Sequence, residues 1–185
     1  MACKIFLTAV AVAGLAAWSV SACAASVSID GGDGAVGVHA GTALLPMLHA
    51  GVDYLHTGDD RGRAKVYGVG LAISPPTPLV HWSVGARYQY QDSRWGKGGG
   101  VELGASLFVD TPVPMLSVGG YGFYLPSSTA HGDVRHGSDY GAQLRWSLTR
   151  SIYAYAGYRW MRTDFERAGT RTLYKGPALG LSVGF

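Results

Sequence analysis

Residues 80–91 alternate between two chemically different series of side chains, and this alternation limits the fold more than any other feature of the sequence. The even-numbered positions hold only apolar or aromatic residues: Val80, Trp82, Val84, Ala86, Tyr88 and Tyr90. The odd-numbered positions are polar or small: His81, Ser83, Gly85, Arg87, Gln89 and Gln91. A period of two residues is that of a β-strand with different environments on its two faces. An apolar series with aromatic residues near both ends is typical of a strand that faces lipid.

The same alternation marks ten segments and predicts an all-β fold, a transmembrane antiparallel up-and-down β-barrel. The predicted strands are residues 25–30, 35–42, 47–56, 64–74, 80–91, 98–109, 114–125, 138–148, 152–163 and 173–185. Short, often proline-bearing connectors (43–46, 75–79, 110–113, 149–151) alternate with mostly longer polar ones (31–34, 57–63, 92–97, 126–137, 164–172). This matches the short periplasmic turns and longer extracellular loops of bacterial outer-membrane barrels.

The first predicted strand is the weakest of the ten. Residues 31–34 are Gly-Gly-Asp-Gly, which form either a tight extracellular turn or a bulge. A bulge would merge the first two strands, and the alternative is then an eight-stranded barrel with a loose N-terminal segment.

Residues 1–24 predict a secretory signal peptide, followed by a single barrel domain at 25–185. Lys4 precedes an uncharged apolar run that is shorter than the roughly 20 residues of a membrane-spanning helix. Ala22-Cys23-Ala24 has the small residues of a cleavage site, and acylation of Cys23 as a lipoprotein is the alternative. The only cysteines, Cys3 and Cys23, lie in this leader, so the barrel is expected to have no disulfide.

The inward-facing series of the predicted barrel carries charges of both signs. A lumen charge network is expected from six residues: Asp53, Arg87, Glu102, Asp139, Arg145 and Arg159. Because an unpaired ion is costly to bury, these groups should pair with one another or meet water. A salt-bridge network that fills the barrel is the favoured interpretation, and a narrow pore or small-solute site is the alternative.

The outward-facing series carries aromatic residues that are expected at the membrane interfaces. They are Trp82, Tyr88, Tyr90, Trp146 and Trp160. The sequence ends with outward apolar residues and an aromatic carboxylate at Phe185. This ending resembles the signal that the outer-membrane barrel assembly machinery recognises, so Phe185 is expected to be an assembly signal.

Two groups of residues suggest chemistry, and both are secondary hypotheses. His81 and Ser83 lie on one strand face beside Glu102 on the next strand, an arrangement that could mimic a hydrolase trio in a lipid-modifying, deacylase-like barrel enzyme. A second group lies in the longest loop, where His131, Asp133, Arg135 and His136 sit together with Asp139 just after them. The two histidines, flanked by aspartates, could hold a divalent ion. The favoured interpretation assigns no catalytic, cofactor or metal residues, and predicts that the protein is not an enzyme.

The net charge and the absence of known motifs argue against several other classes of function. The formal net charge of +3 is too small to argue for nucleic-acid binding. No phosphate-binding glycine loop precedes a helix and no cysteine pair is available for zinc, so no cofactor is expected. A soluble periplasmic carrier resembling a lipocalin is a third possibility, but it requires the apolar series to face a core.

Four segments, in their order along the chain, resemble the YfaZ family of proteobacterial outer-membrane proteins. They are Ala22-Cys23-Ala24-Ala25-Ser26-Val27-Ser28, Gly68-Val69-Gly70-Leu71, Ala156-Gly157-Tyr158-Arg159, and Lys175-Gly176-Pro177 through Gly180 to Phe185. The resemblance covers nearly the whole chain and implies an outer-membrane β-barrel, without an assigned reaction. We therefore expect a structural or narrow-pore barrel of a Gram-negative outer membrane. Its partners would be membrane lipid, lipopolysaccharide and the assembly machinery.

Overall fold

The computed structural model describes residues 25–32, 34–58, 63–149 and 151–184. The predicted signal peptide with Cys23, and the terminal Phe185, lie outside the described residues. Within them, no helix is long and apolar enough to cross a membrane.

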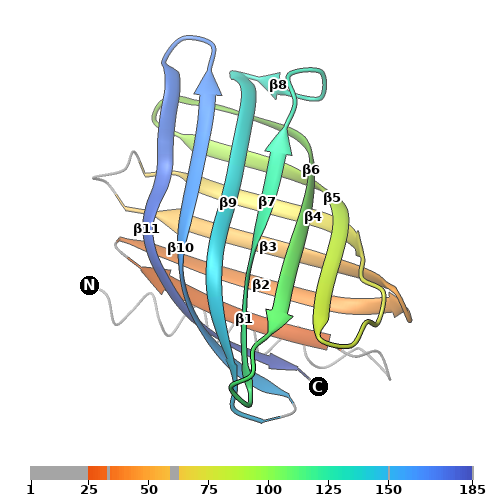
Figure 1. Ribbon diagram of the computed structural model, residues 1–185. Helices are drawn as coiled ribbons and strands as arrows, with labels where there is room; N and C mark the ends of the chain where they lie inside the picture. Colours follow the sequence, from red (N-terminus) through yellow and green to blue (C-terminus); the bar gives the residue numbers. More distant parts are fainter. Residues whose placement is uncertain (1–24, 33, 59–62, 150, 185) are drawn as a thin grey trace.

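The described chain forms one antiparallel sheet of eleven strands (Figure 1). The strands are β1 (Ala25–Gly32), β2 (Ala35–Leu45), β3 (Leu48–Thr57), β4 (Lys65–Ile73), β5 (Val80–Ser93), β6 (Gly96–Asp110), β7 (Leu116–Leu125), β8 (His131–Gly132), β9 (Val134–Ser147), β10 (Ile152–Phe165) and β11 (Gly169–Gly184).

The sheet closes into a ten-stranded barrel, because β1 pairs with β11 as well as with β2. Each barrel strand pairs with the next along the chain, and β7 pairs with β9 across the short β8. This confirms the predicted up-and-down barrel. Gly32 and Ala35 are paired across a turn, so the first two strands are separate and the eight-stranded alternative is wrong.

The alternation of side chains places apolar residues outside and polar residues inside, as predicted. On β5, Trp82, Val84 and Tyr88 are exposed on the outer surface. On the same strand, Arg87, Gln89 and Gln91 are buried in the lumen. Large apolar side chains on the other strands are exposed in the same way, including Val69, Leu71, Leu103, Leu107, Leu144, Leu179 and Leu181. The lipocalin-like alternative is therefore wrong, because it requires these residues to face a core.

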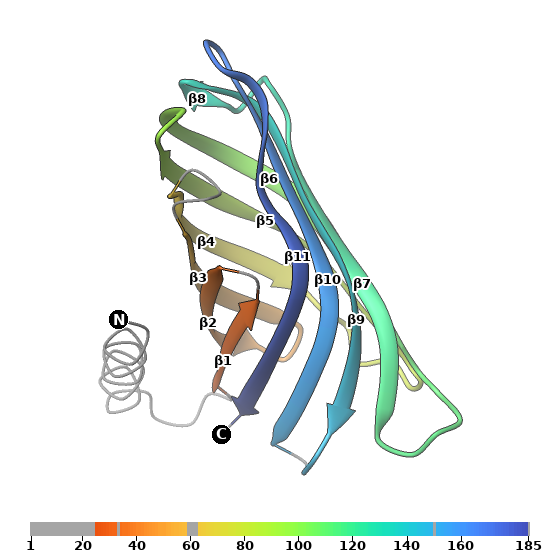
Figure 2. The ribbon, with the colours of Figure 1, turned by 90° about the vertical axis from the view of Figure 1, so that its left-hand side faces the viewer.

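The barrel has two different rims. The terminal rim carries both ends of the described chain, since Ser26 pairs with Gly184. The loop rim, at the opposite end, is slanted: Figure 2 shows the wall of β9, β10 and β11 rising above the wall of β1, β2 and β3.

The connectors at the loop rim are shorter than predicted. Most of the 92–97 and 164–172 segments continue the strands, with turns only between Ser93 and Gly96 and between Phe165 and Gly169. Gly96 and Gly169 have φ values of 151° and 67°, which glycine adopts without steric cost. The polar composition of these segments suggested loops, but their residues continue the pairing of the barrel strands.

The predicted 126–137 loop contains β8 and the start of β9. Strand β7 pairs with β6 only up to Leu103 opposite Tyr124, which leaves the upper part of β6 without this partner. Two residues of β8 pair with that free edge, Gly132 with Gly98 and His131 with Gly99. The segment thus covers a strand edge that would otherwise expose unpaired backbone groups.

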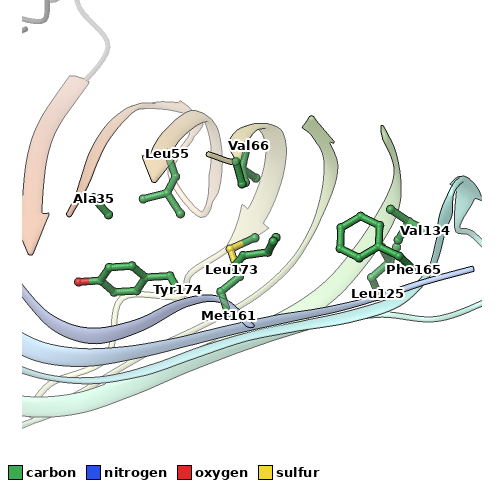
Figure 3. Close-up of a cluster of buried hydrophobic side chains, with 10 residues drawn as sticks. Ala35, Leu55, Val66, Leu125, Val134, Met161, Phe165, Leu173 and Tyr174 are labelled. Carbon is green, nitrogen blue, oxygen red and sulfur yellow. The ribbon is translucent and has the colours of Figure 1, made fainter. Parts of the chain in front are cut away.

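The lumen near the loop rim is filled by apolar side chains, which the sequence analysis did not predict. We call this cluster the apolar plug: Ala35, Leu55, Ala64, Val66, Leu125, Val134, Met161, Phe165, Leu173 and Tyr174. Figure 3 shows Leu55 and Val66 on one wall facing Met161 and Leu173 on the other. A register shift beside Met161 turns both Leu173 and Tyr174 inward. Burial of these side chains stabilises the packed end of the barrel.

Candidate functional site

The candidate site is the polar part of the lumen between the apolar plug and the terminal rim. A cavity of about 370 Å³ occupies this space. One wall of the cavity carries small side chains, including Ser26, Ser28, Gly41, Gly51 and Gly85. The other carries large ones, including Tyr121, Phe123, Arg145, Tyr153 and Tyr155. The cavity therefore exists because glycine and serine face bulky residues across the barrel.

Four of the six predicted lumen charges form one network. Arg87 donates from Nε to Glu102 Oε2 at 2.6 Å and from Nη2 to Asp139 Oδ2 at 2.7 Å. Arg159 donates to both oxygens of Asp139, at 2.9 Å from Nε and 2.8 Å from Nη2. These four residues are no more than 9% exposed. Each buried ion is thus paired with short, charge-assisted hydrogen bonds.

The strand pairing explains how the network assembles. Arg87 and Glu102 lie directly opposite each other on β5 and β6. Asp139 comes from β9, which is not a neighbour of β5, so its bond to Arg87 crosses the lumen. Gly70 lies beside Arg87, and a side chain there would come within 2.7 Å of the arginine Cβ. The network therefore spans the barrel and is accommodated by a glycine on the neighbouring strand.

The other two predicted lumen charges, Asp53 and Arg145, line the cavity and stay outside this network. Within the described part of the chain, neither forms an ion pair. Arg145 stacks on Phe108, with the guanidinium carbon 3.3 Å from the ring centroid. Two of the six residues thus keep charges that no carboxylate or guanidinium neutralises directly.

A further lumen pair was missed by the sequence analysis. His39 Nε2 lies 3.0 Å from Asp30 Oδ1, on the neighbouring strands β2 and β1. Gly37 leaves room for this carboxylate, since a side chain there would come within 2.6 Å of Asp30. Both residues fall on inward positions of the first two predicted strands, so the alternation of side chains could have indicated this pair.

The proposed hydrolase trio is not assembled. His81 Nε2 lies 3.1 Å from Asp110 Oδ2, and Ser83 Oγ lies 2.8 Å from Ser106 Oγ. Glu102 is bound to Arg87 instead. The strand register separates Ser83 from Glu102, so the three groups cannot act together in this arrangement.

The loop residues considered for a metal ion have separate partners. His131 Nε2 is 2.7 Å from the Tyr88 hydroxyl, Asp133 accepts from the Lys97 backbone at 3.0 Å, and His136 is 3.7 Å from Asp164. Arg135 is exposed. Among the residues that the structure describes, no group of three or more His, Cys, Asp or Glu side chains could share a metal ion.

The outward aromatic residues lie at two levels of the barrel. Trp82 and Trp146 are 37% and 58% exposed and lie near the terminal rim. Tyr88, Tyr90 and Trp160 lie nearer the loop rim, where Trp160 packs against Tyr140 and Tyr158.

Solved structures with some similarity to this chain include three outer-membrane proteins. The KdgM porin in complex with disordered oligogalacturonate is 9% identical, with a TM-score of 0.49 over 88% of this chain and 99% of that chain. The N-terminal β-barrel domain of Pseudomonas aeruginosa OprF is 13% identical, with a TM-score of 0.40 over 88% and 96% of the two chains. Neisserial surface protein A is 15% identical, with a TM-score of 0.40 over 88% and 94%.

A comparison with curated protein sequences finds no match. The model of one protein family, described as YfaZ precursor, matches residues 2–185. This match covers nearly the whole chain and agrees with the resemblance in its sequence. The protein therefore belongs to the YfaZ family.

Proposed function

We propose that this protein is a small barrel of the Gram-negative outer membrane with a structural or limited-passage role. The observation that carries this proposal is the state of the lumen: the apolar plug fills one end, and the Arg87–Asp139 contact crosses the middle. In such a lumen, any passage of solute would require the plug side chains to move, so we expect limited passage and no steady flow. The terminal rim, where the cavity lies, would face the periplasm, because outer-membrane barrels place their termini and short turns there.

The outer surface supports the membrane location. Exposed aliphatic side chains cover the barrel wall, and the aromatic residues lie toward both ends. Exposed apolar surface of this extent is stable only against lipid or a partner. We propose that Trp82 and Trp146 mark the periplasmic interface, and that Tyr88, Tyr90 and Trp160 lie toward the outer one.

We propose two partners, lipopolysaccharide and the barrel assembly machinery. Exposed arginines at the loop rim, among them Arg94, Arg135, Arg162 and Arg167, would meet the phosphate groups of lipopolysaccharide. The C-terminal Phe185 would be bound by the barrel assembly machinery during insertion, which a deletion of this residue tests. Reduced heat-modifiable, membrane-inserted protein is expected, and unchanged insertion would contradict the assignment.

Planar-bilayer conductance tests the closed lumen. We expect the purified wild-type barrel to show no steady current above background. Triple alanine substitution of Met161, Phe165 and Leu173, which removes side chains from the plug, should produce frequent openings. A variant with Leu103, Leu179 and Leu181 changed to alanine on the outer face should behave like wild type. Steady wild-type currents equal to those of the plug variant would overturn the proposal.

A lipid-modifying enzyme is the second candidate, and the geometry does not favour it. His81 and Ser83 belong to the inward series, where they would not meet a long-chain lipid on the outer face, and Glu102 is held by Arg87. Lipid hydrolysis by wild type that is lost in Ser83→Ala would restore this candidate.

A further inference from the structure

We propose that Arg145 is the anchor of an anion site in the lumen cavity, and that this site binds a small organic monocarboxylate from the periplasm. The periplasmic access rests on the orientation proposed above, whereas the site itself rests on the contacts of Arg145.

The three lumen arginines differ in how their donors are used. Arg87 donates to Glu102, Asp139 and Gln89, and Arg159 binds both oxygens of Asp139. Among the described residues, Arg145 forms one hydrogen bond, from Nη2 to Gln143 Oε1, at 3.5 Å. Its Nε is buried and has no hydrogen-bond partner within the described part of the chain. A guanidinium with unused donors in a partly buried place is costly, and a carboxylate would satisfy it.

Two aromatic rings restrict the position of this guanidinium. The Phe108 ring centroid is 3.3 Å from the Arg145 guanidinium carbon, and the Tyr153 centroid is 5.6 Å away. An aromatic ring covers one side of the guanidinium, and Arg145 still lines the cavity. Arg145 is thus held in place before a ligand arrives, so a planar carboxylate could bind with little loss of side-chain freedom.

The cavity gives the ligand space and a route. Arg145 faces Tyr155 and Ser117 on the neighbouring strands, close to the end of β9 at Ser147. The volume of about 370 Å³ falls within the roughly 300–1,000 Å³ of typical small-molecule sites. Because the plug fills the opposite end of the lumen, a ligand would enter from the terminal rim.

The other charges of the cavity restrict the ligand to one negative charge. Asp30 and Asp53 also line the cavity, and Arg87 and Arg159 are neutralised by Glu102 and Asp139. A second negative group would therefore meet carboxylates without a free guanidinium. The aromatic side chains of Tyr121, Phe123 and Tyr153 favour a ligand with a flat apolar body.

Titration calorimetry of the purified full-length barrel in detergent tests the site with three probes. Benzoate carries the carboxylate, benzamide is its neutral counterpart of the same shape, and phthalate carries two carboxylates. We expect benzoate to bind at millimolar concentration or below, and to bind at least about tenfold more tightly than either other probe, a difference of about 1.4 kcal/mol. Equal binding of benzamide, or no benzoate binding, would overturn the proposal.

Substitutions assign the binding to Arg145. Arg145→Gln should weaken benzoate binding at least about tenfold, and Arg145→Lys should retain part of it, because the charge remains while the planar fork is lost. Arg135→Gln, which removes an exposed arginine at the opposite rim, should leave binding unchanged. Heat-modifiable gel mobility confirms that each variant is folded. Should Arg145→Gln not fold, equal affinity in Arg145→Lys and wild type would count against the site.

The outcome is separate from that of the conductance experiment. If the wild-type barrel is closed to current and does not bind benzoate, only the anion site is refuted. Steady current in a barrel that binds benzoate through Arg145 would refute only the closed lumen.

Discussion

The two ends of the lumen use the same strand alternation to opposite effect. Toward the loop rim the inward positions carry Leu55, Val66, Met161 and Phe165, which pack together and exclude water. Toward the terminal rim the inward positions carry serine and glycine opposite tyrosine and arginine, which leaves a cavity. The outer face is apolar along the barrel wall and the terminal rim, and carries exposed arginines such as Arg135 and Arg162 at the loop rim. The comparison indicates that lipid determines the outward residues, whereas the inward residues determine whether the barrel is packed or open.

The charge network lies between the two ends, and its loss should have the largest effect. Asp139→Ala leaves Arg87 and Arg159 buried without their shared carboxylate, so we expect a loss of about 3–5 kcal/mol in the free energy of unfolding. Urea unfolding in lipid vesicles, followed by gel mobility, measures this loss.

The rim pair of Asp92 and Lys97 provides the matched control. Its side chains are 40% and 64% exposed, with 2.8 Å between Oδ2 and Nζ. Asp92→Ala should cost no more than about 1 kcal/mol, because an exposed ion pair is screened by water. Equal losses for Asp92→Ala and Asp139→Ala would show that burial of the network does not matter.

Two leucines on opposite faces of β11 allow the stability contributions of the plug and of the outer wall to be compared. Leu173 is fully buried in the plug, and Leu179 is 62% exposed outside. Leu173→Ala should cost about 2–4 kcal/mol, because it leaves a cavity among packed side chains. Leu179→Ala should cost less, since it loses transfer energy without leaving a cavity. The same unfolding assay measures both, and a larger loss for Leu179→Ala would contradict a packed plug.

A small and local effect is expected where β8 covers the edge of β6. Tyr88→Phe removes the 2.7 Å hydrogen bond to His131, which should cost about 1 kcal/mol locally. Faster hydrogen exchange at the amides of residues 131–133 would report it, with exchange in β10 unchanged. Protection as strong as in wild type would show that the backbone pairs with Gly98 and Gly99 hold β8 alone.

Much of the fold could be predicted because period-two alternation fixes both strand positions and faces. The contact between Arg87 and Glu102 was also accessible, since both were predicted inward on adjacent strands. The bond from Arg87 to Asp139 was not, because it crosses the closed lumen and depends on barrel diameter and shear. The separate place of Arg145 depends on its stacking on Phe108, which no residue spacing indicates.

The plug was missed for a different reason. Its inward residues are apolar, so near the loop rim the alternation weakens and resembles neither a lipid-facing strand nor a polar lumen. Leu55 and Val66 lie opposite each other on β3 and β4, which alternation alone could have indicated. The inward turn of both Leu173 and Tyr174 depends on a register shift, which the sequence pattern does not show.

The most direct test of a lumen packed at one end and open at the other is the reactivity of single cysteines. Residues 25–185 contain no cysteine, so Ser28→Cys in the cavity and Thr57→Cys beside the plug can be labelled alone. With a small charged methanethiosulfonate reagent on the folded protein, Ser28→Cys should react nearly as fast as an exposed Arg167→Cys. Thr57→Cys should react far more slowly, whereas equal rates at Ser28→Cys and Thr57→Cys would contradict a packed plug.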